Sequence, residues 1–222
     1  METSGFSCIL WDVDGTIADA TRGIFARLTE VFESFGRPAP DASELAMWMG
    51  PPLLESFQLR GGMSPDEAQR ALTQYRGLSS APGYASTVDL YPGVPEIVRA
   101  VSAAGIPQAT ASTKPETQVR AILDHYELLP SFTALSGARS GPEGQLDGKA
   151  FVVQQALDRL TAAGADVSRP VLIGDRYHDV EGGAEHNMPV VFVEWGFGKP
   201  EEAAGAAHHA MTPADLRQFV LG

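Results

Sequence analysis

The sequence predicts an α/β fold, a doubly wound parallel sheet of about five core strands with an all-helical segment inserted after the first strand. Three observations predict it. A short apolar run opens the chain, no strand pattern occurs between about 18 and 86, and apolar runs then alternate with helical patterns. Such alternation is typical of right-handed crossovers, which build parallel sheets. We expect residues 1–17 and 88–222 to form the α/β core and residues 18–87 the helical insertion.

The first part of the chain gives one strand and then helices. Residues 6–11 form an apolar run that predicts a short buried strand. Apolar side chains then recur at helical spacing over 24–35, and Gly36 is a typical helix stop. Residues 64–67 read Ser-Pro-Asp-Glu, which combines an N-cap, a proline at the first helical position and a glutamate three residues on. The sequence therefore predicts helices throughout the insertion.

The second part of the chain alternates strands with helices from residue 91 on. Four apolar runs predict further core strands, at 106–111, 132–135, 171–173 and 190–194. Helical patterns lie between them, at about 93–104, 115–126, 149–163 and 178–187. With the opening strand, these runs give five strands for the core sheet.

Composition excludes several classes of function. The 222 residues carry 16 basic and 28 acidic side chains, a net charge of −12, which disfavours nucleic-acid polymers and anionic membrane surfaces. The single cysteine, Cys8, gives no disulfide framework. The first residues lack the basic region of a signal peptide, and no apolar stretch reaches the ~18 residues of a membrane helix. We expect a soluble, cytoplasmic protein, monomeric or homodimeric, that acts on a small molecule.

Two carboxylates follow the first predicted strand. Residues 12–16 read Asp-Val-Asp-Gly-Thr. Because side chains two apart on a strand share a face, Asp12 and Asp14 should project together where open parallel sheets bind ligands. Two close carboxylates coexist if a divalent cation lies between them or if one holds a proton. The alternative is a loop that is merely rich in turn-forming residues.

A second acidic strand end occurs later in the chain. Residues 171–175 read Val-Leu-Ile-Gly-Asp, and Asp179 follows four residues on, one helical turn from Asp175. The alternative is that one of these aspartates only caps the helix. Acidic ends on two strands favour a site for a hard cation with oxygen ligands.

Two further segments suggest phosphate binding. A predicted strand ends at Ser112, Thr113 and Lys114 just before a helix, whose N-terminal N–H groups suit an anion. Thr113 with Glu116 also fits a capping box, and the two interpretations do not exclude each other. Lys149 opens another predicted helix. A lone lysine of this kind is most often solvated surface, and it gains meaning only beside the other motifs.

Together these motifs resemble the haloacid dehalogenase-like superfamily, in its phosphatase branch with a helical cap. The resemblance covers nearly the whole chain and follows the family's order, with the 12–16 motif, Ser112, Lys149 and finally the 174–179 motif. Tyr-Pro-Gly-Val at 91–94, Thr-Lys-Pro at 113–115 and Trp-Gly-Phe-Gly at 195–198 resemble phosphoglycolate phosphatases. Gly-Pro-Pro-Leu at 50–53, Lys-Ala at 149–150 and Gly-Asp-Arg-Tyr-His-Asp at 174–179 are closer to bacterial 5′-nucleotidases.

The resemblance implies a Rossmann-like core and a Mg²⁺-dependent site. Asp12 would be the nucleophile and Asp14 the general acid and then base, while Ser112 and Lys149 would bind the phosphoryl oxygens. Mg²⁺ would be held by Asp12, the backbone carbonyl of Asp14 and Asp175, with Asp179 as a further ligand or as a support for these ligands. The wider substrate-binding set would comprise Gly15, Thr16, Thr113 and Lys114 in the core and Arg22 and Gly50 in the cap.

Three functions are compatible with these motifs. The first is hydrolysis of a small phosphomonoester, a nucleoside 5′-monophosphate or otherwise phosphoglycolate. The second is a phosphomutase similar to β-phosphoglucomutase, and the third is a non-catalytic protein that binds a phosphometabolite. The second carboxylate, Asp14, argues against the related dehalogenases, which lack it. Phosphonate-cleaving relatives use a cap lysine, and residues 18–86 contain no lysine.

Overall fold

The computed structural model describes residues 5–48, 53–79, 83–141 and 143–222. The chain divides into two compact units. Met1–Asp19 and Leu90–Gly222 form the first, and Ala20–Asp89 the second. We call them the α/β unit and the helical unit and treat each separately.

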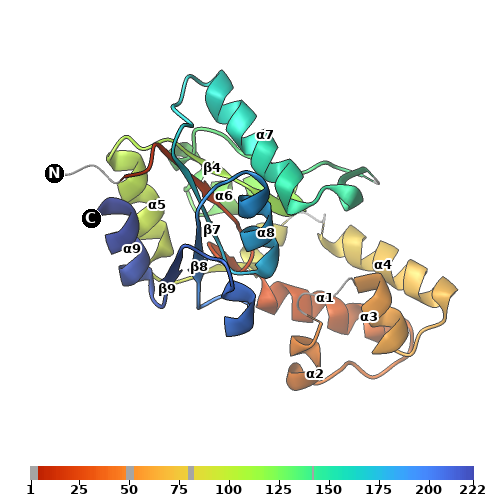
Figure 1. Cartoon of the computed structure of the whole chain (residues 1–222). Helices are drawn as coiled ribbons and strands as arrows, with labels where there is room; N and C mark the ends of the chain where they lie inside the picture. Colours follow the sequence, from red (N-terminus) through yellow and green to blue (C-terminus); the bar gives the residue numbers. More distant parts are fainter. Residues whose placement is uncertain (1–4, 49–52, 80–82, 142) are drawn as a thin grey trace. The chain divides into compact units, whose positions relative to one another are not determined.

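A five-stranded parallel sheet forms the centre of the α/β unit (Figure 1). Its strand order is β4-β1-β7-β8-β9, with β4 at Gln108–Thr110, β1 at Cys8–Trp11, β7 at Pro170–Gly174, β8 at Val190–Val193 and β9 at His208–Ala210. The first strand of the chain, β1, lies between β4 and β7, and every pair of neighbours is parallel. The predicted α/β class with a parallel sheet is confirmed.

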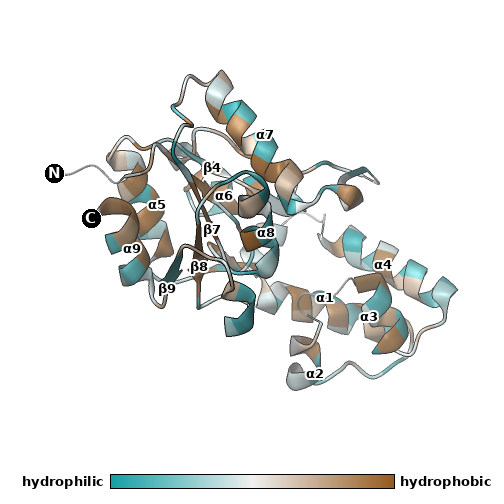
Figure 2. Cartoon of the chain, in the orientation of Figure 1, coloured by the Kyte–Doolittle hydropathy of each residue, from teal (hydrophilic) through white to brown (hydrophobic). Residues whose placement is uncertain are grey.

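Helices cover both faces of this sheet, as expected for a doubly wound fold. Helices α5 (Val94–Ala103) and α9 (Pro213–Leu221) lie together on one side, and α7 (Lys149–Ala162) and α8 (Tyr177–Glu185) on the other (Figure 1). On the second side, Val153 and Leu160 of α7 pack against Leu10 and Leu172 of the sheet. In Figure 2 strands β7 and β8 are hydrophobic, whereas α7 alternates between hydrophobic and hydrophilic residues, because only one face of this helix packs on the sheet.

Two strand predictions need correction. The run at 132–135 is not a core strand, since it meets β4 only at an isolated bridge between Ala109 and Ala134. A short apolar run marks burial and does not by itself specify a hydrogen-bonded ladder. The fifth core strand is β9 instead. It is a polar edge strand in which only Ala210 is buried, so a search for apolar runs misses it.

A small second sheet continues from β4. Strand β5 (Ser112–Pro115) pairs in parallel with β6 (Gly137–Ala138), and helix α6 (Glu116–His125) follows directly. The predicted capping box of Thr113 and Glu116 is wrong. The N-cap of α6 is Pro115, whose side chain offers no hydrogen-bond acceptor. Thr113 does not cap the helix because it lies within strand β5. Short 3₁₀ turns complete the unit at η2 (Leu129–Ser131), η3 (Glu143–Leu146) and η4 (Pro200–Ala203).

The helical unit has its own core. It comprises α1 (Thr21–Ser34), α2 (Ala42–Ala46), α3 (Leu53–Leu59), α4 (Pro65–Ser79) and the 3₁₀ turn η1 (Tyr84–Thr87). The aromatic rings of Phe32, Trp48 and Phe57 pack together, with centroids 5.2 to 6.3 Å apart. The predicted start of α4 is confirmed, because the amide of Glu67 donates to Ser64 Oγ at 3.3 Å and the amide of Ser64 to the Glu67 carboxylate at 2.9 Å. Strands β2 (Ala18–Asp19) and β3 (Asp89–Leu90) form a two-stranded sheet.

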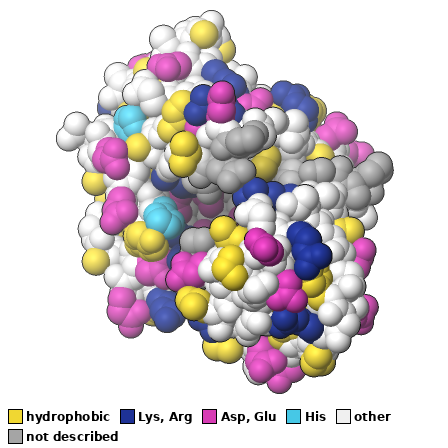
Figure 3. All heavy atoms as spheres, turned by 90° about the vertical axis from the view of Figure 1, so that its right-hand side faces the viewer, with side chains coloured by type: hydrophobic (Ala, Val, Ile, Leu, Met, Phe, Trp, Pro, Cys, Tyr) yellow, Lys and Arg dark blue, Asp and Glu magenta, His cyan; other side chains and the backbone are white. Residues whose placement is uncertain are grey.

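Surface charge is mixed, and the described helices are short. On the face shown in Figure 3, acidic and basic side chains are interspersed and form no broad patch of one sign. No helix in the described ranges is both long and apolar enough to cross a membrane.

Candidate active site

The ends of two neighbouring strands bring the first acidic residues together. In the register of β1 and β7, Trp11 lies opposite Ile173, and the amide of Asp12 donates to the Ile173 carbonyl at 2.8 Å. Asp12 and Asp175 therefore both leave the sheet at its carboxyl edge. Both are buried, at 6% and 0% exposure, although carboxylates are normally solvated. A buried pair of this kind needs compensating groups.

Lys149, at the first position of α7, supplies the positive charge of the site. Its Nζ lies 2.8 Å from Asp12 Oδ1 and 2.6 Å from Asp179 Oδ1, and it donates to the Ala111 carbonyl at 2.9 Å. Asp179 is held from the other side, where the Arg176 amide donates to its Oδ2 at 3.0 Å. The sequence alone did not distinguish Lys149 from a solvated surface lysine. In the structure its side chain is buried between two of the predicted metal ligands, Asp12 and Asp179.

The electrostatics show one cation facing several anions. Burial alone lowers the pKa of Lys149, but the charges of Asp12 and Asp179 outweigh burial, so its pKa lies above the usual lysine value. Burial, with added repulsion from Asp12 and Asp179, raises the pKa of Asp175 to about 8. Burial also raises the pKa of Asp179. A single lysine therefore does not balance the three carboxylates.

The donor set of this cluster fits a divalent cation. Asp12, Asp175 and Asp179 each offer an oxygen within 4.8 Å of the others, and all three side chains are buried. Asp179 Oδ1 accepts no hydrogen bond from a residue in the described part of the chain and meets Lys149 only as an ion pair. All-oxygen ligand sets of this kind suit Mg²⁺. The carboxylate of Asp14 is not part of this group.

A loop after β8 holds Asp175 in place. The amide of Phe197 donates to Asp175 Oδ2 at 2.7 Å. A Cβ on Gly196 would collide with Asp175 and with the Gly15 carbonyl, so only glycine fits there. Trp195 Nε1 donates to the Thr16 carbonyl at 3.1 Å. In the sequence, the 195–198 motif carries only a family resemblance, and its two glycines are the signal for this close approach.

Asp14 is bound by a different lysine. Lys114 Nζ lies 2.6 and 2.9 Å from the two carboxylate oxygens of Asp14. Lys114 is buried, whereas the Asp14 side chain is one-third exposed. Ser112, on the same strand β5, is buried, and its Oγ accepts from the Lys114 amide at 3.3 Å. Thr113 between them is exposed. The structure therefore brings Lys114 to the predicted acid–base residue.

The first turn after β1 fixes the remaining residues of the motif. Gly15 has φ +82°, and a Cβ there would collide with the Asp175 carboxylate. Thr16 is buried, and its Oγ1 lies 3.4 Å from Asp175 Oδ1. Sequence analysis gave no role to Tyr91, whose pKa is raised by burial and by the charges of Asp19, Asp175 and Asp14. Its hydroxyl therefore stays neutral beside the acidic cluster.

Two predicted substrate-binding residues belong to the insertion. In the helical unit, the guanidinium of Arg22 is bound by Asp89, with two contacts of 3.0 Å, and by the Ser86 carbonyl at 2.9 Å. The other, Gly50, lies outside the described residues. Arg22 thus connects the two ends of the helical unit.

Comparison with known proteins identifies the family of the chain. Residues 9–193 match the family model described as haloacid dehalogenase-like hydrolase. The chain is 31% identical to the tyrosine-protein kinase PtkA of Mycobacterium tuberculosis over 95% of this chain and 71% of PtkA. It is 30% identical to a 5′-nucleotidase of Pseudomonas aeruginosa over 96% and 94% of the two chains. It is 26% identical to a phosphoglycolate phosphatase of Pseudomonas syringae over 96% and 78%.

Solved structures give the same result. A predicted phosphatase from Clostridium acetobutylicum superimposes with a TM-score of 0.80 and 28% identity, covering 97% of this chain and 98% of that one. The family match spans both acidic strand ends, Ser112 and Lys149. The chain belongs to the haloacid dehalogenase-like hydrolase family, as an enzyme of its phosphatase branch.

Proposed function

We propose that the protein is a Mg²⁺-dependent phosphomonoester hydrolase that acts through an aspartyl-phosphate on a small phosphorylated metabolite. One observation carries this proposal. A buried carboxylate, Asp12, is paired with Lys149 and lies in a cluster of three buried aspartates, while a second carboxylate, Asp14, leaves the same strand end and is held separately by Lys114. The position of Asp12 suits a nucleophile beside a cation, and the position of Asp14 suits an acid–base group.

In the first half-reaction, an oxygen of Asp12 attacks phosphorus, and the bond from phosphorus to the ester oxygen breaks. Asp14 donates a proton to that leaving oxygen, and the alcohol departs. In the second half-reaction, water attacks the same phosphorus and loses its proton to Asp14. The bond from phosphorus to Asp12 then breaks, which releases phosphate, restores the Asp12 carboxylate and leaves Asp14 protonated for the next turnover.

The other residues bind and orient. Lys149 Nζ, 2.8 Å from Asp12 Oδ1, partly neutralises the nucleophile and also offers N–H groups to phosphoryl oxygens. Ser112 Oγ supplies a further donor at the end of the neighbouring strand. Lys114 keeps the Asp14 carboxylate in a fixed position, 2.6 Å from its Nζ. These contacts support a preorganised site. Such positioning of the reacting groups is a main source of the rate enhancement in enzymatic phosphoryl transfer.

Asp12, Asp175 and Asp179 would hold Mg²⁺, with the Asp14 carbonyl as a fourth ligand. When bound, the ion would offset the repulsion among the carboxylates and shield the charge on the phosphoryl oxygens. The Phe197 amide and Gly196 would keep Asp175 oriented toward it.

Among substrates we place nucleoside 5′-monophosphates first and phosphoglycolate second. The 5′-nucleotidase relative is 30% identical and matches along almost its whole length, whereas the phosphoglycolate phosphatase is 26% identical. We further propose that the helical unit is a cap that selects the leaving group and excludes water, with Arg22 and Gly50 as its substrate-contacting residues.

The test is phosphate release from a panel of 5′-nucleotides, phosphoglycolate, hexose phosphates and p-nitrophenyl phosphate, with Mg²⁺ or with EDTA. We expect release that requires Mg²⁺, is abolished in Asp12→Asn, and has its highest kcat/KM on a 5′-nucleotide. A folded Asp12→Asn variant with full activity would contradict the nucleophile assignment. Hexose phosphates that isomerise without releasing phosphate would indicate a mutase.

The PtkA relative supports a second candidate, transfer of the phosphoryl group to a tyrosine instead of to water. It differs in the donor, which is ATP with ADP as the leaving group, and in the acceptor of the second half-reaction, which is a tyrosine hydroxyl. Incubation of the protein with γ-³²P-ATP, followed by phosphoamino-acid analysis, separates the two. Phosphotyrosine that is absent from Asp12→Asn would favour the kinase, and no phosphotyrosine in a protein that releases phosphate from the ester panel would favour the hydrolase.

A further inference from the structure

A cavity of about 260 Å³, lined mainly by polar and charged residues, opens in the α/β unit between α6, β6 and α7. Its lining contains none of the aspartates of the catalytic cluster and neither lysine that binds them. The residues that matter here are Glu116, Thr117 and Arg120 of α6, Ser140 after β6, and Gln155 and Arg159 of α7. The mechanism assigns a role to none of them.

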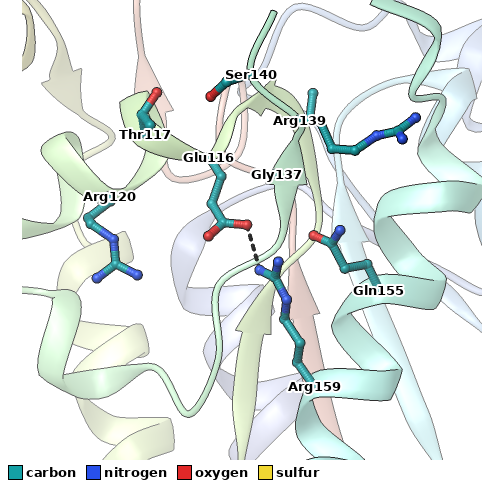
Figure 4. Close-up of a pocket in the computed structure, with 9 residues that line it drawn as sticks. Glu116, Thr117, Arg120, Gly137, Arg139, Ser140, Gln155 and Arg159 are labelled. Atoms are coloured by element: carbon teal, nitrogen blue, oxygen red, sulfur yellow. Dashed lines mark hydrogen bonds and ion pairs between the residues drawn. The ribbon is translucent and has the colours of Figure 1, made fainter. Parts of the chain in front are cut away.

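Two guanidinium groups and one carboxylate set the charge of this cavity. Arg159 Nη1 lies 2.5 Å from Glu116 Oε2 and also donates to the Leu135 carbonyl, so its guanidinium is fixed. In the view of Figure 4, Glu116 lies between Arg120 and Arg159. Arg120 has no ion pair or hydrogen bond to another described residue. The cavity therefore keeps one positive charge in excess, in a chain whose net charge is −12.

A third arginine lines the cavity without adding to this charge. The guanidinium of Arg139 points away from the Glu116–Arg159 pair in Figure 4. It is bound by Asp147, at 2.7 Å, and by Glu143, at 3.2 Å. Arg139 thus forms a wall of the cavity and leaves Arg120 and Arg159 as the cations that face it.

The backbone adds to the attraction for an anion. Helix α6 begins at Glu116, and its N-cap, Pro115, offers no side-chain acceptor to the first N–H groups. Thr117, the second residue of this ten-residue helix, lines the cavity. The N-terminal end of a helix carries partial positive charge, so it reinforces the two arginines.

We propose that this cavity binds the phosphate group of a small organic phosphate. Guanidinium groups match the oxygens of phosphate in a two-pronged geometry, and here two of them lie beside hydroxyl, amide and helix N–H donors. At about 30 Å³ for each water, the cavity holds about nine waters, which is more room than one phosphate group fills. The organic part of the ligand would occupy the rest.

Glu116 gives the proposal a distinctive signature. It is the one carboxylate among the lining residues, and it competes with an incoming phosphate for Arg159. Binding must therefore displace or weaken the ion pair of Glu116 and Arg159. Removal of the Glu116 charge should strengthen phosphate binding, an effect that damage to the fold cannot mimic.

The experiment is a site-resolved NMR titration of the ¹⁵N-labelled protein in EDTA. The probes are inorganic phosphate, phenylphosphonate and, as a carboxylate of similar size, benzoate. The amides of Thr117 and Gly137 report on the cavity, and those of Asp12 and Asp175 report separately on the catalytic cluster. Arg120→Ala and Glu116→Gln are compared with Arg217→Ala, which removes another exposed arginine, from α9.

We expect saturable shifts at Thr117 and Gly137, with phenylphosphonate tighter than inorganic phosphate. Arg120→Ala should weaken binding about tenfold, which is the loss of one charge-assisted hydrogen bond, while Arg217→Ala should change nothing. Glu116→Gln should strengthen binding several-fold. Equal affinity for phosphate and phenylphosphonate would retain the phosphate site and identify the free ion as its ligand.

Three results would overturn the proposal. The first is shifts confined to Asp12 and Asp175, with none in the cavity. The second is equal effects of Arg120→Ala and Arg217→Ala. The third is benzoate binding as tightly as phenylphosphonate, because a phosphate site must prefer the dianion.

Discussion

Among single residues, Lys149 compensates more buried charge than any other described side chain of the site. It lies within 2.8 Å of Asp12 and within 2.6 Å of Asp179, and all three side chains are buried. Lys149→Met should cost about 3–5 kcal/mol of stability in EDTA, because it leaves buried carboxylates unpaired. Mg²⁺ should restore part of this loss by supplying positive charge to the same oxygens.

Urea denaturation with and without Mg²⁺ measures this effect. Lys199→Met is the matched control, since Lys199 is exposed. Equal stability of the Lys149→Met and Lys199→Met variants would mean that Lys149 does not balance the cluster.

Cys8 gives a prediction about pH. It is fully buried in β1, and burial raises the pKa of its thiol from 9.0 to about 11. Because the folded value is the higher one, the thiol contributes its full stability below pH 9 and loses it as the pH rises to about 11. The loss should amount to about 3 kcal/mol relative to Cys8→Ala. A difference in unfolding free energy between the two proteins that stays constant from neutral pH to pH 11 would refute this.

At the scale of elements, the 195–198 loop holds Asp175, a proposed metal ligand, from outside the cluster. A Cβ on Gly196 would collide with Asp175, whose Oδ2 accepts from the Phe197 amide at 2.7 Å. Gly196→Ala should therefore weaken divalent-ion binding about 10–100-fold, as is typical when a group that orients a ligand is disturbed.

Calorimetric titration with Mn²⁺ measures that affinity directly, without substrate. Gly77→Ala in α4 is the control, because a Cβ there meets nothing and the helix gains propensity. An unchanged Mn²⁺ affinity in Gly196→Ala would show that Asp175 needs no support from this loop.

The start of α4 is a second prediction about an element. Ser64 and Glu67 exchange hydrogen bonds of 3.3 and 2.9 Å at this N-terminus. Ser64→Ala should cost about 1 kcal/mol, and Ser64→Asp should retain most of the cap. Hydrogen exchange of the first amides of α4 separates a local loss from a global one. Equal protection in the alanine and aspartate variants would contradict the cap.

For the whole molecule, the features that depend on the local sequence pattern could be predicted from the sequence. Buried strands followed by aspartates, as at 6–14 and 171–175, must meet at one edge of a parallel sheet, so the acidic cluster could be predicted. The pairing of Lys114 with Asp14, 100 residues apart, could not, because it depends on how β5 continues from β4. The polar strand β9 was missed for a related reason, since an edge strand needs little apolar surface.

The net charge of the chain does not predict the charge at an individual site. A net charge of −12 describes the average surface, whereas the acidic cluster and the cavity of Arg120 and Arg159 depend on a few nearby cations. Composition correctly directs attention to small ligands and cannot identify the cavity of Arg120 and Arg159. That cavity forms only when α6 and α7, from separate parts of the chain, pack beside β6.

The central claim is that Asp12 carries the phosphoryl group during turnover. Rapid acid quench with the best ³²P-labelled substrate from the panel, followed by peptide mapping, tests it most directly. We predict a labelled enzyme within the first turnover, with a hydroxylamine-sensitive phosphoryl group on Asp12 that is absent from Asp12→Asn. Single-turnover release of phosphate with no labelled enzyme at any time, or a label on another residue, would contradict the account.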